Sequence, residues 1–297
     1  MTRLGSKLLH FPKFVYFAAK HIYEEHEIQQ GKSRHRSLML ENLINLNIAE
    51  RYKNSKNDFA KYGASFFSQG DEDGLTLEIV RRIEPKTKLF IEFGVGDGSE
   101  NNTIILRASG YRGAWIDALE NKFLVEAENE DFYYSKNWVN KENVIEIFNN
   151  YRGIFKSDPS IISLDLDGND YWLWESILEN GLTPDVAIAE YNPRYPVPIE
   201  WVMKYDSSHQ WEEDDYFGAS LASLSNLFKR FGYTALVCSI QGTNVFFIRN
   251  KHLQKFPELT TLGNIYQDAY HIFGKSRMGR VSRRTVLSII QGDRIEF

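Results

Sequence analysis

Apolar and polar positions follow two different patterns along the chain. Residues 1–65 place apolar residues three and four positions apart with charges between them, as in "FPKFVYFAAKHIYEEHEI". This spacing is typical of amphipathic helices. From about residue 68, short and continuously apolar runs alternate with amphipathic segments. The change predicts an N-terminal helical extension over residues 1–65, followed by a separate α/β core.

Five apolar runs predict the strands of this core, and they are residues 88–94, 113–119, 143–148, 160–166 and 184–191. Amphipathic segments predict its helices, which are residues 68–83, 101–109, a segment from about 121, 171–180 and 218–231. The runs have no polar face, and strands of that kind are buried on both sides. The alternation therefore predicts a parallel sheet that helices cover on both faces.

The end of the core departs from this alternation. "YTALVCSI" and "NVFFIRN" are separated only by the three residues "QGT". A link this short predicts a hairpin, because parallel strands need a longer crossover. The predicted fold is thus α/β, with a mostly parallel, doubly wound sheet and an antiparallel last strand, over residues 66–250. Residues 251–297 form a predicted C-terminal extension.

Composition and charge narrow the classes of partner and compartment. The net charge of −5 gives no basic footprint, so we expect no nucleic-acid partner. The single cysteine, Cys238, excludes an intramolecular disulfide and fits a cytoplasmic location. The most apolar early stretch, "FVYFAA", has six residues, so no transmembrane segment is predicted. The sequence leaves a homo-oligomer open.

A glycine-rich turn, "EFGVGDGS", follows the first predicted strand. Glycines let the backbone turn sharply and approach a ligand closely. The spacing differs from the G-x-G-x-x-G of dinucleotide enzymes, because the third glycine comes one residue early. The next strand ends at Asp117, whose carboxylate can accept hydrogen bonds from both ribose hydroxyls of a nucleoside. The predicted cofactor-binding residues are Glu92, Gly94, Gly96, Asp97, Gly98 and Asp117.

A tight G-x-G-x-G turn after an acidic strand residue resembles class I methyltransferases that use S-adenosylmethionine (SAM). Together, "SQGDEDG", "EFGVGDGSENNT", "SLDLDGNDYW", "AEYNP", "YFGAS" and "GTNVFFIRN" resemble the FkbM-type methyltransferase-like families, over residues 68–250. The resemblance implies a Rossmann-like class I methyltransferase fold with SAM as the cofactor. It also implies O-methylation of a sugar or glycan precursor, for which a nucleotide-linked or lipid-linked acceptor is expected.

The ends of the fourth and fifth predicted strands, "LDLDGNDY" and "AEYN", are similar to metal-dependent O-methyltransferases of the caffeoyl-CoA and sugar types. The similarity implies that Asp165 and Glu190 bind Mg²⁺ or another divalent cation, with Asn192 as a third ligand and Asp167 as the base. Tyr191 stands where those enzymes keep a second oxygen ligand. A metal-free site, with Asp167 or His209 as the base, therefore stays open.

Two further functions compete with this interpretation. "LDLDG" also resembles the first motif of haloacid-dehalogenase phosphatases, in which Asp165 would be the nucleophile. That motif normally opens its domain, whereas here it ends the fourth strand, and Asn169 replaces the usual hydroxyl residue. The phosphatase interpretation also leaves the glycine-rich turn unexplained. The second competitor is a methyltransferase-like binding module that has lost turnover.

Two pairs of residues are candidates for binding the acceptor. Trp211 and Tyr216 precede the helix at 218–231 and either stack on a sugar ring or simply pack. Arg283 and Arg284 lie in the basic cluster "KSRMGRVSRRTV", residues 275–286. A run of charges is usually a solvated face, but arginine forks also bind phosphate in a bidentate manner.

Overall fold

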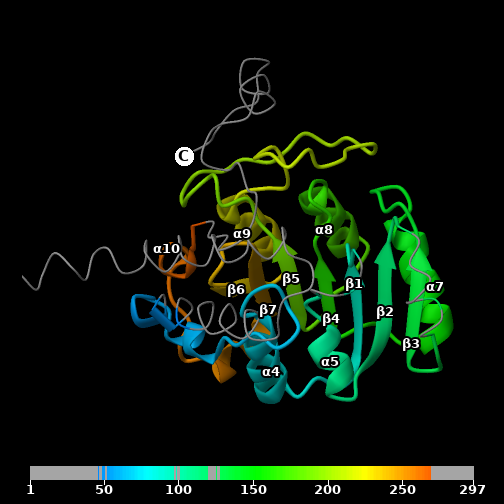
Figure 1. Ribbon diagram of the computed structural model, residues 1–297, viewed down its shortest axis with the longest axis horizontal. Coiled ribbons are helices and arrows are strands. Elements are labelled where there is room, and N and C mark those ends of the chain that lie inside the picture. The colour runs from blue at the N-terminus through cyan, green and yellow to red at the C-terminus, as the bar shows by residue number, and fades with distance from the viewer. Residues whose placement is uncertain are drawn as a thin grey trace, which may run out of the picture. The chain divides into compact units, whose positions relative to one another are not determined.

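A seven-stranded sheet forms the centre of the computed structural model (Figure 1), with the order β3-β2-β1-β4-β5-β7-β6. The structure describes residues 46, 49–50, 52–96, 98, 101–119, 125 and 128–268. The strands are β1 (Leu89–Phe93), β2 (Arg112–Asp117), β3 (Phe132–Lys136), β4 (Ile161–Leu164), β5 (Val186–Glu190), β6 (Tyr233–Cys238) and β7 (Asn244–Arg249). All of them lie in one compact unit, whose described residues fall between 56 and 268.

Strands β1 to β5 pair in parallel, and β7 runs antiparallel to both β5 and β6. The mostly parallel α/β fold with an antiparallel last strand is therefore confirmed. β1 and β4 are neighbours near the middle of the sheet. From β1 the strands are added in one direction and from β4 in the other, so the strand order reverses between them. In open α/β sheets, ligands bind outside the carboxyl ends of the strands at such a switch point.

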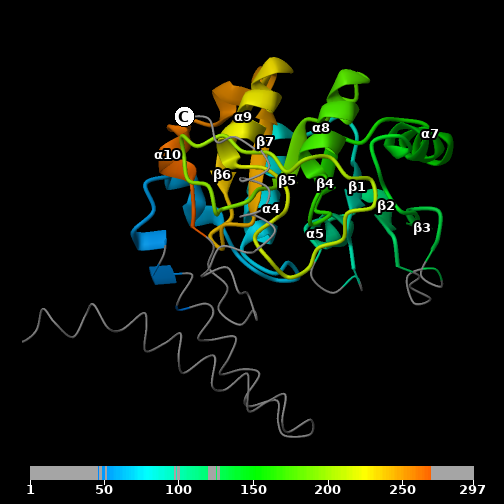
Figure 2. The same cartoon turned by 90° about the horizontal axis from the view of Figure 1, so that it is seen from above.

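Helices cover both faces of the sheet, as Figure 2 shows, with α4 and α5 on one side and α7, α8 and α9 on the other. Their bounds are α4 (Glu72–Ile83), α5 (Ile104–Ala108), α7 (Val144–Phe155), α8 (Asp170–Glu179), α9 (Leu221–Arg230) and α10 (Leu262–Ile265), with 3₁₀ helices η1 (Asp58–Tyr62) and η2 (Asn250–Lys255). The core between the layers is strongly aromatic. Phe228 of α9, for example, stacks on Phe247 of β7 with ring centroids 4.0 Å apart.

The prediction of a third strand at residues 143–148 is wrong. "NVIEIF" leads into α7, and the third strand is "FYYSK" at Phe132–Lys136. The short window looked like a strand because it alternates branched apolar residues with Glu146. The apolar positions continue at helical spacing to Phe155, and that longer period decides the structure. The helix expected from about residue 121 falls mostly outside the described residues.

The predicted extensions at the two ends are only partly open to description. Residues 1–45 and 269–297 lie outside the described residues, so the boundaries at 65 and 250 stay predictions. Within the compact unit, Asn57 donates from Nδ2 to the carbonyl of Leu236 in β6 at 2.9 Å. No helix among the described residues is both long enough and apolar enough to cross a bilayer.

Arg82 of α4 joins α4 to the segment after β7, and we expect Arg82→Ala to lower the free energy of unfolding by about 2–3 kcal/mol. Its guanidinium makes two 2.8 Å bonds to Glu258 and one 2.7 Å bond to Glu78. It also lies 5.0 Å from the ring centroid of Phe59 and 5.6 Å from that of Phe256. Denaturant unfolding measures the change.

Arg81 provides the matched control for this prediction. It also bonds to Glu78, at 2.7 Å, but its side chain is 70% exposed. Arg81→Ala is expected to leave the unfolding midpoint close to that of the wild type, since exposed ion pairs contribute little. Equal losses in the two variants would contradict the special role of Arg82.

Candidate functional site

The glycine-rich turn leaves β1 in a conformation that side chains disfavour. Gly94, Gly96 and Gly98 have φ angles of +80°, +53° and +85°. The N–H of Gly94 donates to the carbonyl of Ile116 in β2 at 2.9 Å. A Cβ on Gly94 would lie 1.5 Å from the carbonyl oxygen of Asp165. At Gly94 the turn thus passes between the ends of β2 and β4 with no room for a side chain.

Asp117 fastens this turn to the end of β2. One carboxylate oxygen accepts a hydrogen bond from the N–H of Gly96 at 2.8 Å, and the other accepts one from the N–H of Leu119 at 2.7 Å. Each oxygen keeps a second lone pair for a ligand donor. The structure therefore brings together Gly94, Gly96 and Asp117 of the predicted cofactor set. Asp97 lies outside the described residues.

Glu92 lies beneath the turn and is 3% exposed. Its carboxylate accepts hydrogen bonds from the N–H groups of Asn102 at 2.8 Å and Thr103 at 3.1 Å. Burial raises the pKa of Glu92 to about 7, although these hydrogen bonds act in the opposite direction. The carboxylate holds the segment that follows the turn, so we treat Glu92 as a positioning residue for the turn.

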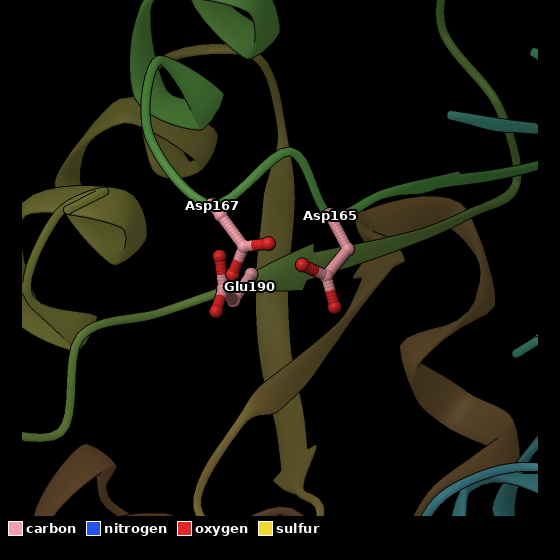
Figure 3. A group of neighbouring side chains, drawn as sticks. All are labelled: Asp165, Asp167 and Glu190. Carbon is pink, nitrogen blue, oxygen red and sulfur yellow. The ribbon is translucent and has the colours of Figure 1, made fainter. Parts of the chain in front are cut away.

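Three carboxylates converge where β4 and β5 end (Figure 3). Asp165, Asp167 and Glu190 each offer an oxygen, and these oxygens all lie within 4.8 Å of one another. The two strands are parallel neighbours, so their carboxyl ends lie at the same edge. Asp165 also touches the turn, through the close approach of its carbonyl to Gly94. The acidic cluster is thus adjacent to the predicted cofactor turn.

The loop between β4 and α8 sets the position of Asp167, which has a φ of +52°. Asp170 stabilises this loop, because its carboxylate accepts hydrogen bonds from the N–H groups of Leu166 and Gly168, each at 2.9 Å. Asn169 stands at the N-cap position of α8, but its side chain makes no capping bond and instead donates to the carbonyl of Asp206 at 2.7 Å.

The electrostatics of the cluster favour a cation. Burial, together with the neighbouring carboxylates, raises the pKa values of Asp165 and Glu190 well above their usual range, and the two side chains share a hydrogen bond. Burial raises the pKa of Asp167 to about 6. Glu190 Oε2 is buried and has no hydrogen-bond partner among the described residues. An all-oxygen, negatively charged donor set of this kind fits a hard divalent cation.

Asn192, the third ligand predicted from the sequence, has its amide committed elsewhere. Its Nδ2 donates to the carbonyls of Asp215 and Phe217, each at 2.9 Å. Its Oδ1 accepts the N–H of Arg194 at 2.9 Å. These bonds fix the loop after β5, so Asn192, unlike Glu190, has no unpartnered oxygen directed at a cation.

His209 lies against the loop that carries Asp167. The residue is 9% exposed, and a Cβ added to Gly168 would lie 2.4 Å from His209 Cδ2. The long segment between β5 and α9, which contains His209, passes over the carboxyl ends of the strands (Figure 1). The structure therefore places His209 in contact with the loop that carries Asp167, and its role as a base stays a prediction.

The predicted acceptor-binding residues differ in their surroundings. Trp211 is 41% exposed, and its Nε1 donates to the carbonyl of Asp214 at 2.8 Å. The ring of Tyr216 packs edge-on against Trp201, with centroids 5.8 Å apart. Trp211 also packs edge-on against Phe217, with centroids 6.4 Å apart. Both rings therefore take part in packing, and Trp211 is the more exposed of the two. Arg283 and Arg284 lie outside the described residues.

Sequence reasoning missed two buried residues on the other side of Glu190. Glu72, the first residue of α4, accepts a hydrogen bond from Asn244 Nδ2 at 3.2 Å. Asn244 opens β7 and is the register partner of Glu190 in β5. The motifs "SQGDEDG" and "GTNVFFIRN" contain both residues, but no local pattern shows that they meet.

No protein-family model matches the sequence, and the search of curated proteins gives no match. Among solved structures, one titled "PigF with SAH" is similar, with 14% sequence identity and a TM-score of 0.31. The alignment covers 82% of this chain and 72% of that chain. At this TM-score the likeness adds nothing to the strand order, on which the assignment of the chain to the Rossmann-like α/β fold rests.

Proposed function

We propose that the protein is a SAM-dependent O-methyltransferase that acts on a hydroxyl of a sugar or glycan precursor. The observation that carries the proposal is the contact between Gly94 and the carbonyl of Asp165. It brings a glycine-rich turn suited to a nucleoside cofactor next to a cluster of carboxylates suited to a hydroxylated acceptor. Both lie at the carboxyl edge of the sheet, where ligands of open α/β folds bind.

The proposed mechanism gives each residue one role. The turn and Asp117 hold the cofactor, so that its methyl group faces the acceptor hydroxyl. Asp165 and Glu190 hold a divalent cation, which when bound lowers the pKa of that hydroxyl. Asp167 takes the hydroxyl proton as the carbon–oxygen bond forms and the carbon–sulfur bond breaks. Without a cation, burial raises the pKa of Asp167 to about 6, so its carboxylate is more basic than that of an ordinary aspartate.

The acceptor class follows from the same groups. A cation held by carboxylates binds vicinal hydroxyls well, and a partly exposed aromatic ring such as that of Trp211 can stack on a sugar ring. A sugar is therefore the acceptor class we propose, and its nucleotide or lipid linkage stays a prediction. The FkbM-type resemblance points the same way and stays a prediction.

The phosphatase alternative gains nothing from the geometry. Its nucleophile, Asp165, shares a hydrogen bond with Glu190, and both side chains have raised pKa values. The alternative also leaves the bond from Gly96 to Asp117 without a purpose.

Titration calorimetry with SAM and S-adenosylhomocysteine tests the cofactor. Asp117→Ala is expected to weaken binding at least tenfold, because hydrogen bonds to a charged acceptor contribute about 1.5–3 kcal/mol. Asp131→Ala is the matched control and should bind like the wild type. It removes a half-exposed aspartate just before β3, at the end of the strands away from the glycine-rich turn.

The outcome of this titration also separates the competing functions. Binding of the cofactor together with methyl transfer to diol-bearing sugar nucleotides supports the proposal. Binding without transfer to any acceptor indicates the binding module. Absence of cofactor binding, combined with phosphate release from an aryl phosphate, would replace the methyltransferase by the phosphatase.

A further inference from the structure

Asn244 faces Glu190 across the antiparallel pair of β5 and β7. The N–H of Tyr191 donates to the carbonyl of Thr243 at 2.9 Å, so those two residues form a hydrogen-bonded pair. The pairs alternate along an antiparallel ladder, which makes Glu190 and Asn244 a non-hydrogen-bonded pair. In such a pair the side chains point to the same face, with Cβ atoms about 4.5–5.5 Å apart.

The amide of Asn244 has a fixed orientation. Its Nδ2 donates to Glu72 Oε1 at 3.2 Å, and Glu72 Oε2 in turn accepts the N–H of Gly70 at 2.9 Å. The reverse orientation would place the amide oxygen against a carboxylate. Asn244 Oδ1 therefore points away from Glu72.

Two buried oxygens without donors result from this arrangement. Asn244 is 5% exposed and Glu190 is 7% exposed. Neither Asn244 Oδ1 nor Glu190 Oε2 has a hydrogen-bond partner among the described residues. A buried acceptor without a partner costs about 1–3 kcal/mol, so a pair of them on facing residues indicates a group that binds between them.

We propose that Asn244 Oδ1 is a further ligand of the divalent cation held by the acidic cluster, and that Glu72 is the residue that positions it. This inference rests on the proposed function, which assigns a cation to Asp165 and Glu190. A neutral amide oxygen adds a hard ligand without adding charge to three carboxylates. Asn244 takes the place that the sequence predicted for Asn192, and the buried acid of "SQGDEDG" gains a role.

Binding of Mn²⁺, measured by electron paramagnetic resonance on the full chain, tests the inference without any turnover. Asn244→Ala is expected to weaken Mn²⁺ binding at least tenfold and to leave the affinity for S-adenosylhomocysteine unchanged. Glu72→Gln should also weaken Mn²⁺ binding. The amide of the glutamine can donate a hydrogen bond to Asn244 Oδ1, the atom proposed to bind the cation. Loss of an outer partner typically costs 10–100-fold in metal affinity.

Asn192→Ala is the matched control, since it removes the amide that holds the neighbouring loop. It should lower the melting temperature while the folded protein binds Mn²⁺ like the wild type. If Asn244→Ala fails to fold, Asn244→Leu supplies a side chain of similar size without the oxygen. The same loss of Mn²⁺ affinity is expected from it.

The outcomes separate this inference from the function on which it rests. A wild-type chain that binds no Mn²⁺ overturns both the cation site and the role of Asn244. A wild-type chain that binds Mn²⁺, together with Asn244→Ala or Asn244→Leu that binds it equally well, overturns the role of Asn244 alone. In that case the two oxygens are joined by water, and the cation site keeps its carboxylates.

Discussion

Gly94→Ala is expected to abolish detectable binding of S-adenosylhomocysteine and to lower the melting temperature. The new methyl group would lie 1.5 Å from the carbonyl oxygen of Asp165, which is a backbone atom and cannot swing aside as a side chain does. The residue must also keep a φ of +80°. The chain can accept the methyl only if β1 and β4 separate at their carboxyl ends, where the turn and the acidic cluster meet. Titration calorimetry and thermal unfolding measure the two effects.

Gly96→Ala is the control that separates this clash from simple backbone strain. Gly96 also has a positive φ, of +53°, but nothing lies within 4 Å of the position its Cβ would take. The strain of a left-handed alanine is about 1–2 kcal/mol, so Gly96→Ala should lose a little stability and bind the cofactor more weakly. If Gly94→Ala binds as well as Gly96→Ala, the turn does not depend on its contact with Asp165.

The fold could be predicted because its signals are local. Continuous apolar runs gave β1, β4 and β5, and the three residues between "YTALVCSI" and "NVFFIRN" gave the antiparallel hairpin. The failure at residues 143–148 has the same origin. Six residues of "NVIEIF" fit a strand, and only the longer run to Phe155, with Phe148 and Phe155 in the core, shows the helical period.

The candidate site could be predicted only in part, because its hydrogen bonds join distant segments. Asp165, Asp167 and Glu190 meet because parallel neighbouring strands end at one edge, which is a rule that sequence can apply. The commitment of Asn192 to its own loop, by contrast, depends on where residues 215 and 217 fold back. Glu72 and Asn244 are separated by 172 positions, and only the register of β7 against β5 gives Asn244 a place beside Glu190.

The carboxylates of the acidic cluster destabilise the fold, although they can also bind a cation. Carboxylates with raised pKa values destabilise the fold at neutral pH, because the folded chain must either keep protons that water would remove or hold buried charge. A site built only for stability would replace them with apolar residues. A bound cation would offset the destabilisation that these carboxylates cause. Without a cation, the stability of the folded chain should therefore depend on pH.

Without added metal, the free energy of unfolding is expected to fall as the pH rises from about 4 to about 7, by an amount on the order of 3 kcal/mol. Asp165, Asp167 and Glu190 have raised pKa values in the folded chain, with that of Asp167 at about 6. In this interval the folded chain therefore binds more protons than the unfolded chain, and stability decreases with pH.

Divalent cation should reverse this loss. Mn²⁺ or Mg²⁺ at about one hundred times its dissociation constant stabilises the folded chain by about 2.7 kcal/mol, and the gain should be greatest at neutral pH, where the ligands have lost their protons.

Asp165→Asn removes one charge from the cluster. It should raise the melting temperature above that of the wild type in EDTA at neutral pH, flatten the dependence on pH, and abolish the stabilisation by metal. Asp158→Asn, which changes an exposed aspartate paired with Arg152, should keep the wild-type response to both pH and metal. Thermal unfolding over a series of pH values, with EDTA or with Mn²⁺, measures all of these effects. If the Asp165→Asn variant still gains stability from Mn²⁺, Asp165 is not a ligand. If the wild-type chain is as stable at pH 7 as at pH 5, the carboxyl groups of the cluster do not keep extra protons in the folded chain.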